Sequence, residues 1–175
     1  MTGLFSTRGV SPQTRKPVFL SFDYQVDVMR VSQIRQIGAL EDKPLLSPNE
    51  WEKVQRGGDT AVEQWIDTQM KYKSCVIVLI GRRTAERRWV EHEIVKAWNE
   101  KRGLFGIHIN ALNCPRTGVC SQGANPFANV RLNITNEPLD KFVPVYTPDP
   151  YAPLRDIQLN INSWIDRAVE EKASR

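Results

Sequence analysis

The sequence is poor in cysteine and has no long apolar run, and both absences narrow the classes of protein that it can encode. It holds only three cysteines in 175 residues, and its first residues lack the apolar core of a secretory signal. An odd number of cysteines without an export signal argues against a disulfide framework. No window reaches the roughly 20 apolar residues that a membrane-spanning helix needs. We therefore expect a soluble, cytoplasmic protein without a membrane partner.

Clustered positive charge is also missing. The formal net charge is only +4, with charges of both signs mixed along the chain, so the basic face of a dedicated nucleic-acid-binding protein is not indicated. A weakly anionic ligand fits this balance better. Cys114 and Cys120 share one loop, with His108 upstream, but a zinc site needs a fourth ligand that this segment does not offer. We expect neither a metal nor a nucleic-acid partner.

The length and composition fit one compact domain. Hydrophobic residues make up 41% of the chain, enough to fill one core and leave a polar surface. Residues 1–16 carry Gly, Ser, Thr, Pro and Arg without any apolar period, which is typical of a flexible arm. We expect a flexible N-terminal arm at 1–16 and a single domain at 17–175.

Four segments are predicted as strands. Residues 18–22 are apolar and rich in strand formers, and residues 75–80 form an uninterrupted β-branched run that is typical of a parallel strand buried on both faces. The latter belongs at the centre of a sheet. Residues 104–109 are a third strand. Residues 142–146 are a fourth, placed at an edge because it contains Pro144.

Helices are predicted between these strands from apolar residues three or four positions apart. Asp59 is a candidate cap for the second helix and Thr84 for the third. Between the first two helices, residues 41–58 contain Pro48 and a glycine pair, and we expect a long loop holding a degenerate strand at Leu45-Leu46. A second long loop is predicted at 110–141. The predicted helices are 25–40, 60–72, 84–101 and 156–172.

The alternation of strands and helices predicts an α/β fold, a flavodoxin-like, doubly wound and mostly parallel sheet in three α/β/α layers. Ligands of such folds bind beyond the carboxyl ends of the strands. Those ends supply Asp23 and Tyr24, then Gly81 and Arg82, then Asn110. These five residues are candidates for substrate binding.

The helix after Gly81 carries the strongest chemical signal. Trp89 and Glu93 are four residues apart and share one helix face, whereas Glu91 does not. Cleavage of an N-glycosidic bond needs a fixed carboxylate, because the ribosyl carbon becomes cation-like in the transition state. An aromatic neighbour excludes water and strengthens that interaction. Arg82, Arg83, Arg87 and Arg88 are candidates for contact with a pyrophosphate.

Structural interpretations of the same residues stay open at this point. Glu93 can pair with Lys96 or Arg88 on the surface, with Trp89 as a core anchor. The four arginines can form a solvated charged face. Asp23 fits a helix cap, and Tyr24 fits a packing residue.

Three segments together resemble the TIR-like proteins of the bacterial Thoeris anti-phage system. They are Val18-Phe19-Leu20-Ser21-Phe22-Asp23-Tyr24, then Val78-Leu79-Ile80-Gly81 with Thr84, then Trp89-Val90 with Glu93-Ile94. Residues 106–110 and 125–127 are also similar to that subfamily, so the resemblance spans about residues 17–127.

The resemblance implies a TIR-like fold and an enzyme that cleaves NAD between nicotinamide and ribose, of the NAD nucleosidase or ADP-ribosyl cyclase type. NAD is then the substrate, and no other cofactor is implied. Glu93 is the catalytic glutamate, and Phe19, Ser21, Asp23 and Tyr24 lie at the rim of the nicotinamide and ribose site. The product is an ADP-ribose-derived signal for a separate effector protein, and a homo-oligomer on activation is compatible with this role.

The resemblance also implies that the stretch before Asp59 stands where TIR domains place the loop that mediates assembly and gates the site. A non-catalytic TIR module that only binds partner proteins has the same fold and is the main alternative. A phosphoacceptor receiver domain needs an aspartate where this central strand ends in Ile80-Gly81-Arg82-Arg83. A glycine-rich phosphate loop is also missing after the first strand. The sequence leaves the product open, because linear, cyclic and conjugated ADP-ribose all require the same glutamate.

Overall fold

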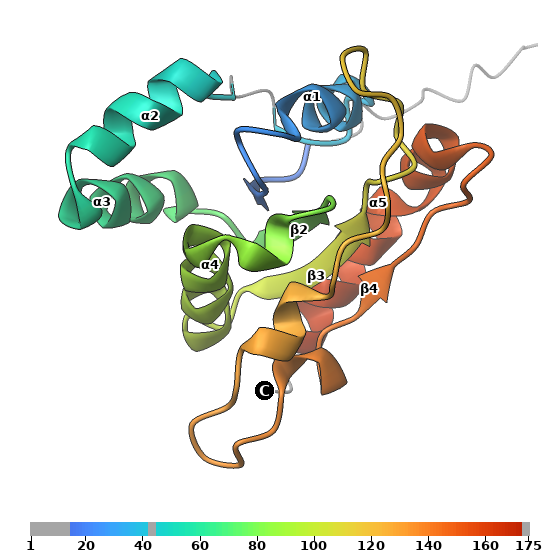
Figure 1. Cartoon of the computed structure of the whole chain (residues 1–175). Helices are drawn as coiled ribbons and strands as arrows, with labels where there is room; N and C mark the ends of the chain where they lie inside the picture. The colour runs from blue at the N-terminus through green and yellow to red at the C-terminus, as the bar shows by residue number, and fades with distance from the viewer. Residues whose placement is uncertain (1–14, 42–44, 173–175) are drawn as a thin grey trace, which may run out of the picture.

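A parallel four-stranded sheet organises the chain in a computed structural model that describes residues 15–41 and 45–172 (Figure 1). Its order is β1-β2-β3-β4. Most of the predicted arm at 1–16 lies outside the described residues. The strands are β1 (Val18–Ser21), β2 (Cys75–Ile80), β3 (Gly103–His108) and β4 (Val145–Tyr146).

The two inner strands form the core. All six residues of β2 and all six of β3 are buried, and the pairing runs from Cys75 opposite Gly103 to Ile80 opposite His108. This confirms the predicted central strand. At the edge, β4 has only two residues, and the carbonyl of Pro144 just before it accepts a hydrogen bond from Gly106 at 3.0 Å. A proline is tolerated there because only its carbonyl faces the sheet.

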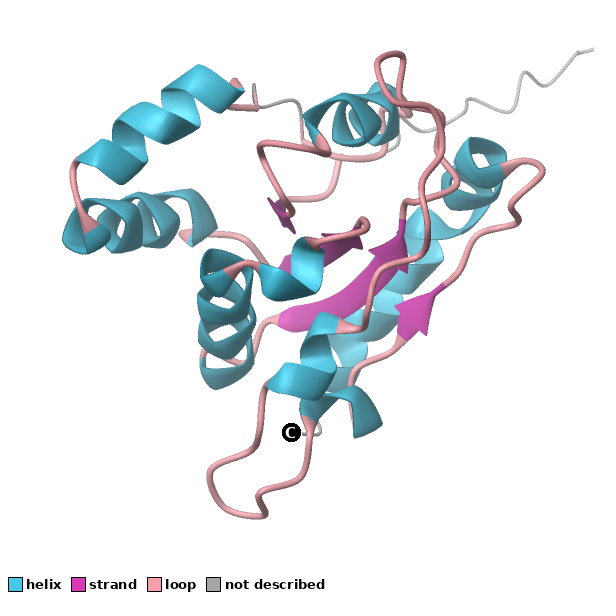
Figure 2. Cartoon of the chain, viewed as in Figure 1, coloured by secondary structure: helices cyan, strands magenta, loops and turns pink. Residues whose placement is uncertain are grey.

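Helices cover both faces of the sheet (Figure 2). On one face α5 packs against β3 and contacts α1, and on the other α3 packs against β1 while α4 covers β2 and β3. This confirms the predicted flavodoxin-like α/β/α architecture. None of the helices in the described ranges is long and apolar enough to cross a membrane. The helices are α1 (Val28–Gln36), α2 (Pro48–Arg56), α3 (Asp59–Met70), α4 (Arg88–Asn99) and α5 (Pro153–Glu171).

The segment before α3 differs most from its prediction. Instead of a loop with a strand at Leu45-Leu46, it forms helix α2. Ser47 caps this helix, its side chain accepting from the Glu50 amide while the Glu50 carboxylate accepts from the Ser47 amide at 2.7 Å. Pro48 fits because the first helical residue needs no amide donor. Among the described residues, the strand-like pairing on this side of β1 is a bridge between Lys16 and Leu40.

Several predicted helix ends also shift. Gly58 occupies the N-cap position of α3, so Asp59 is the first residue of the helix and not its cap. The third predicted helix is split into a short 3₁₀ turn, η1 (Thr84–Glu86), and α4. The hydroxyl of Thr84 accepts from the Gly81 amide at 2.8 Å and so fixes the turn after β2. The first helix starts later than predicted because the Asp23 carbonyl closes a turn with the amides of Val26 and Asp27.

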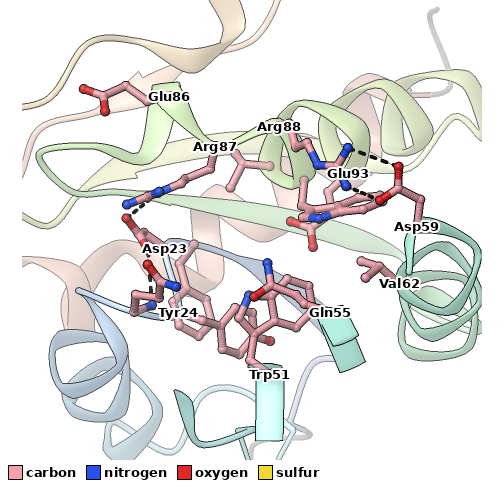
Figure 3. Close-up of a pocket in the computed structure, with 14 residues that line it drawn as sticks. Asp23, Tyr24, Trp51, Gln55, Asp59, Val62, Glu86, Arg87, Arg88 and Glu93 are labelled. Atoms are coloured by element: carbon pink, nitrogen blue, oxygen red, sulfur yellow. Dashed lines mark hydrogen bonds and ion pairs between the residues drawn. The ribbon is translucent and has the colours of Figure 1, made fainter. Parts of the chain in front are cut away.

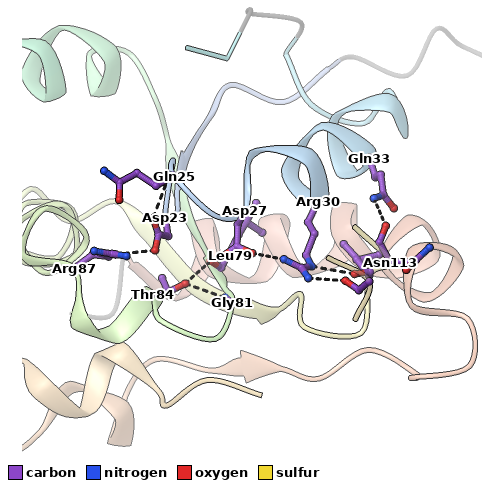
Figure 4. A network of polar contacts seen from close by, with 12 residues as sticks. Asp23, Gln25, Asp27, Arg30, Gln33, Leu79, Gly81, Thr84, Arg87 and Asn113 are labelled. Carbon is purple, nitrogen blue, oxygen red and sulfur yellow. Dashed lines mark hydrogen bonds and ion pairs between the residues drawn. The ribbon is translucent and has the colours of Figure 1, made fainter. Parts of the chain in front are cut away.

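The predicted loop at 110–141 is held by buried polar contacts (Figure 4). It contains two 3₁₀ turns, η2 (Pro126–Asn129) and η3 (Leu139–Lys141). Arg30, only 1% exposed, donates to the carbonyls of Leu112 at 3.0 Å and Gly118 at 2.7 Å, and it pairs with buried Asp27 at 2.8 Å. Gly123 lies so close to the turn after β2 that a Cβ there would meet the Gly81 carbonyl at 2.0 Å. The loop therefore covers the carboxyl ends of β2 and β3.

Candidate functional site

A cavity of about 320 Å³ opens beyond the carboxyl end of β1, between α2, α3 and the start of α4 (Figure 3). Its volume is in the range of small-molecule sites, which starts near 300 Å³. Its lining brings together residues that are far apart in sequence. Among them are Asp23, Tyr24, Trp51, Arg87, Trp89 and Glu93.

Glu93 lines this cavity and is itself almost fully buried, with 3% of its surface exposed. The Ser21 hydroxyl at the end of β1 donates a hydrogen bond to its Oε2 atom. Burial raises the pKa of the Glu93 carboxyl to about 8, against the opposing effect of the Ser21 hydrogen bond. The carboxyl therefore holds its proton at neutral pH, ready to ionise when positive charge is placed beside it.

Trp89 lies one helical turn before Glu93 and lines the same cavity, as their spacing predicts. The Arg88 guanidinium lies over the Trp89 ring, 4.4 Å from its centroid. Asp59 on α3 holds that guanidinium, with one of the two hydrogen bonds at 3.2 Å. The alternative that Glu93 forms a surface ion pair is wrong, because Arg88 pairs with Asp59 and Lys96 pairs with Asp67 and Glu100.

Asp23 and Tyr24 reach the cavity from the end of β1. Asp23 is 3% exposed and accepts from the Gln25 amide at 3.1 Å and from Arg87 Nε at 2.7 Å. Its position does not cap α1, whose N-cap residue is Asp27. Tyr24 stacks on Trp51, with ring centroids 4.9 Å apart. Burial and the nearby Glu93 raise the pKa of the Tyr24 hydroxyl far above its usual value, so it stays a neutral donor.

Helix α2 supplies a wall of the cavity that the sequence analysis missed. Trp51, 6% exposed, packs between Tyr24 and Trp65, and Gln55 lies one turn further along α2 at the cavity. Figure 3 shows Gln55 beside Trp51 on this wall. The signal was present in the sequence as Ser47-Pro48-Asn49-Glu50, which is the pattern of a capping box with proline at the first helical position.

The remaining predicted substrate-binding residues lie outside the cavity lining. Phe19 packs edge-on against Trp65, 6.5 Å between centroids, on the far side of the aromatic cluster. Gly81 lies against Asp27, and Arg82 is exposed. The carbonyl of Asn110 accepts from the Cys120 amide at 3.0 Å. Gly81 and Asn110 do not line the cavity because the 110–141 loop packs over the ends of β2 and β3.

Of the four candidate arginines, only Arg87 and Arg88 line the cavity. Arg83 points to Glu86, with its Nε 3.0 Å from Oε2. Arg82 and Arg83 are both exposed, and Arg83 is paired, which fits the alternative of a solvated charged face for these two residues.

Comparison with known proteins finds similarity over the part of the chain that builds the cavity. The family model described as "Thoeris protein ThsB, TIR-like domain" matches residues 19–114. A protein of Bacillus cereus (strain MSX-D12) named "Putative cyclic ADP-D-ribose synthase ThsB1" is 35% identical over 121 residues. The aligned region covers 64% of this chain and 61% of that relative, so the chain spans less than two thirds of the relative's length.

Proposed function

We propose that this chain, which belongs to the family of Thoeris ThsB TIR-like domains, cleaves NAD between nicotinamide and ribose. The observation that carries the proposal is the Glu93 carboxyl, buried at a cavity of ligand size beside Trp89 and held by Ser21. The printed name of the Bacillus cereus relative, a cyclic ADP-D-ribose synthase, supports the same reaction class.

The chemistry assigns one role to Glu93. When the bond between ribose C1′ and the nicotinamide nitrogen breaks, the electron pair leaves with nicotinamide and the positive charge moves to the ribose ring. An ionised Glu93 carboxylate stabilises that charge, and the low-polarity surroundings of Trp89 and Tyr24 strengthen the interaction. Water or a hydroxyl then bonds to C1′ and loses its proton, whereas an adenine ring nitrogen, which carries no proton, bonds to C1′ through its lone pair.

The raised pKa of Glu93 fits a cationic substrate. The nicotinamide ring of NAD carries a positive charge, and a nearby positive charge favours the ionised form of a carboxyl. Binding of NAD therefore lowers the Glu93 pKa from about 8 and releases a proton. The Ser21 hydroxyl donates to the carboxylate throughout and keeps it oriented.

We further propose that the product is an ADP-ribose-derived signal. Attack by an adenine nitrogen or a ribose hydroxyl of the same molecule closes a ring, whereas attack by water gives linear ADP-ribose. The cyclic route follows the name of the relative. A separate effector protein senses this signal in the cytoplasm during anti-phage defence, NAD is the substrate without a further cofactor, and the active form is a homo-oligomer.

The test is release of nicotinamide from NAD, with the ribosyl product identified by mass spectrometry. Purified protein and phage-infected cells that express the chain are both assayed, because the enzyme can require a trigger. Glu93→Gln is expected to lower the rate by about 100-fold or more, since a neutral amide does not stabilise the developing cation. The control is Glu91→Gln, an exposed glutamate on the same helix that does not line the cavity.

Wild-type rates in Glu93→Gln would refute the assignment of this residue. If neither purified protein nor infected cells consumed NAD while the protein was folded, the chain would instead be a TIR module that binds partner proteins. Circular dichroism of both variants separates loss of chemistry from loss of fold.

A further inference from the structure

Arg87 is placed at the cavity in an unusual way for a surface arginine. It stands just before the first residue of α4 with an extended backbone, φ −91° and ψ 112°. This directs its side chain away from the helix and toward the end of β1. There its Nε donates to the buried carboxylate of Asp23 at 2.7 Å, and Asp23 is in turn fixed by the Gln25 amide at 3.1 Å.

The contact with Asp23 uses only one of the nitrogens of Arg87. Within residues 15–41 and 45–172, its two terminal nitrogens make no hydrogen bond, and the side chain is 30% exposed at the cavity rim. A planar guanidinium held through Nε presents its two terminal nitrogens as a fork that matches two oxygens of a phosphate. Asp23 therefore positions the donors of Arg87 and leaves them free for a ligand.

The neighbouring arginine does not have this freedom. Both terminal nitrogens of Arg88 contact the Asp59 carboxylate, and the plane of its guanidinium covers Trp89. Figure 3 shows the two ion pairs at opposite sides of the cavity. Arg87 is thus the lining arginine whose terminal nitrogens have no protein partner among the described residues.

The start of α4 adds to the positive potential at this rim. No side chain caps the helix, so the positive end of its dipole, which lies next to Arg87, is not offset by a side-chain acceptor. Arg87 and Glu93 are six residues apart, a rise of about 9 Å along the helix axis. A ribose with its 5′-diphosphate covers a separation of this order when C1′ lies at Glu93.

We infer that Arg87, positioned by Asp23, binds the diphosphate of a dinucleotide and makes the cavity selective for NAD over nicotinamide riboside. This inference rests on the proposed function, because it assumes that the nicotinamide and its ribose bind at Glu93. It assigns Arg87 a role in substrate binding and Asp23 a positioning role. The bond-breaking step itself stays with Glu93.

The experiment measures binding in a background that does not turn NAD over, so that it is independent of catalysis. Isothermal titration calorimetry gives the Kd of NAD and of nicotinamide riboside for Glu93→Gln and for Glu93→Gln with Arg87→Gln. We expect the second substitution to weaken NAD by about 10- to 100-fold, as for loss of hydrogen bonds to a charged group, and to leave riboside unchanged. Arg87→Lys is expected to recover part of the NAD affinity, because it keeps the charge without the fork.

The matched control is Arg83→Gln in the same background. Arg83 also donates through Nε to a carboxylate, that of Glu86, but it lies outside the cavity lining, so the Kd of NAD is expected to stay the same. An unchanged NAD Kd in Arg87→Gln would overturn the inference, as would an equal loss of NAD and riboside binding, which indicates a distorted cavity. Nicotinamide release by the wild type is measured separately, so a failure of the proposed function remains distinguishable.

Discussion

The two long connections of this molecule differ in the polar contacts that hold them in place. Residues 45–58 fold into α2, which is fastened by its capping box and by Trp51 packed among aromatic rings. Residues 109–141 have only short 3₁₀ turns and are fastened by buried Arg30, whose side chain binds two of their backbone carbonyls. Trp51 is the buried apolar anchor of the first connection, whereas the second combines buried apolar residues such as Phe127 and Leu139 with a buried ion pair.

This difference matters for function because the two connections have different neighbours. The α2 connection forms a wall of the cavity, so its displacement exposes Glu93 to water. The 109–141 connection covers the ends of β2 and β3 and does not line the cavity. Damage to the first is therefore expected to change the site, and damage to the second is expected to change stability alone.

The largest effect is expected from Arg30→Met. It leaves the 1% exposed carboxylate of Asp27 without its partner and removes two hydrogen bonds to the loop. Breaking a buried ion pair from one side costs about 3–5 kcal/mol, which urea unfolding measures. Arg56→Met, at an exposed pair on α2, is the control and is expected to change stability by less than about 0.5 kcal/mol.

A second substitution tests how much of this loss comes from the unpaired Asp27 carboxylate. Asp27→Asn combined with Arg30→Met is expected to regain only part of the loss, because the carbonyls of Leu112 and Gly118 still lack a donor. Full recovery would show that the loop contacts contribute nothing, and the proposed contrast between the two connections would then fail.

Trp51→Ala is expected to have the next largest effect on stability, about 3 kcal/mol, as for truncation of a buried aromatic residue. Unlike Arg30→Met, it is also expected to raise the KM for NAD, because it opens the cavity wall beside Tyr24. Thermal unfolding and nicotinamide-release kinetics check both parts. A Trp51→Ala variant with an unchanged KM would contradict the role given to α2.

The pH dependence of stability that Glu93 causes also distinguishes the two connections. Its pKa is about 8 in the folded protein and 4.5 in a model peptide, so the folded state retains the proton over this range. The stability from this group is fully present below about pH 4.5 and is lost as pH rises to about 8, at up to about 1.4 kcal/mol per pH unit. Glu93→Gln is expected to lack this slope in urea unfolding at several pH values.

In Trp51→Ala, water that enters the cavity should lower the Glu93 pKa. The pH range over which stability falls should therefore end below about pH 8. Arg30→Met should leave this range unchanged. If stability depended on pH over the same range in both variants, α2 would not be the element that excludes water from the Glu93 carboxyl.

The smallest effect is expected from Ser47→Ala, which removes the capping contact of α2. Loss of such a cap costs about 1 kcal/mol, and urea unfolding resolves it. Ser163→Ala is the control, since its exposed hydroxyl bonds only to the Asn160 carbonyl within α5. If Ser47→Ala lowered the free energy of unfolding no more than the control, the capping box would not be a source of stability for α2.

The parts of the fold that the sequence predicts are those set by local pattern. The apolar run at 75–80 identifies β2 as an inner strand, and the four-residue spacing of Trp89 and Glu93 puts both at one cavity. Pro48 and the glycine pair predict a break in any helix at 41–58, but in the structure Pro48 begins α2 and Gly57 ends it. The depth of Glu93 depends on contacts from distant segments, which spacing alone does not contain.

Sequence spacing also does not predict which of the four arginines, Arg82, Arg83, Arg87 and Arg88, line the cavity. All four are close in sequence, and which of them faces the cavity depends on where the helix starts. Because α4 starts at Arg88 and not at Thr84, Arg87 is extended and reaches Asp23. A shift of one residue in that start would direct a different side chain to the rim.

Arg30 recognises the 109–141 connection through main-chain carbonyls, and such acceptors are the same for every amino acid. The side chains of exposed residues between Leu112 and Gly118, such as Arg116, can therefore change while the anchor persists, whereas Leu112 is itself buried and Gly118 has a φ of 70° that favours glycine. Insertions between the two anchored carbonyls would disrupt the pair of backbone hydrogen bonds that joins Cys114 to Gly118. The molecule thus joins its cavity to a loop whose anchor constrains the path of the backbone more than the exposed side chains.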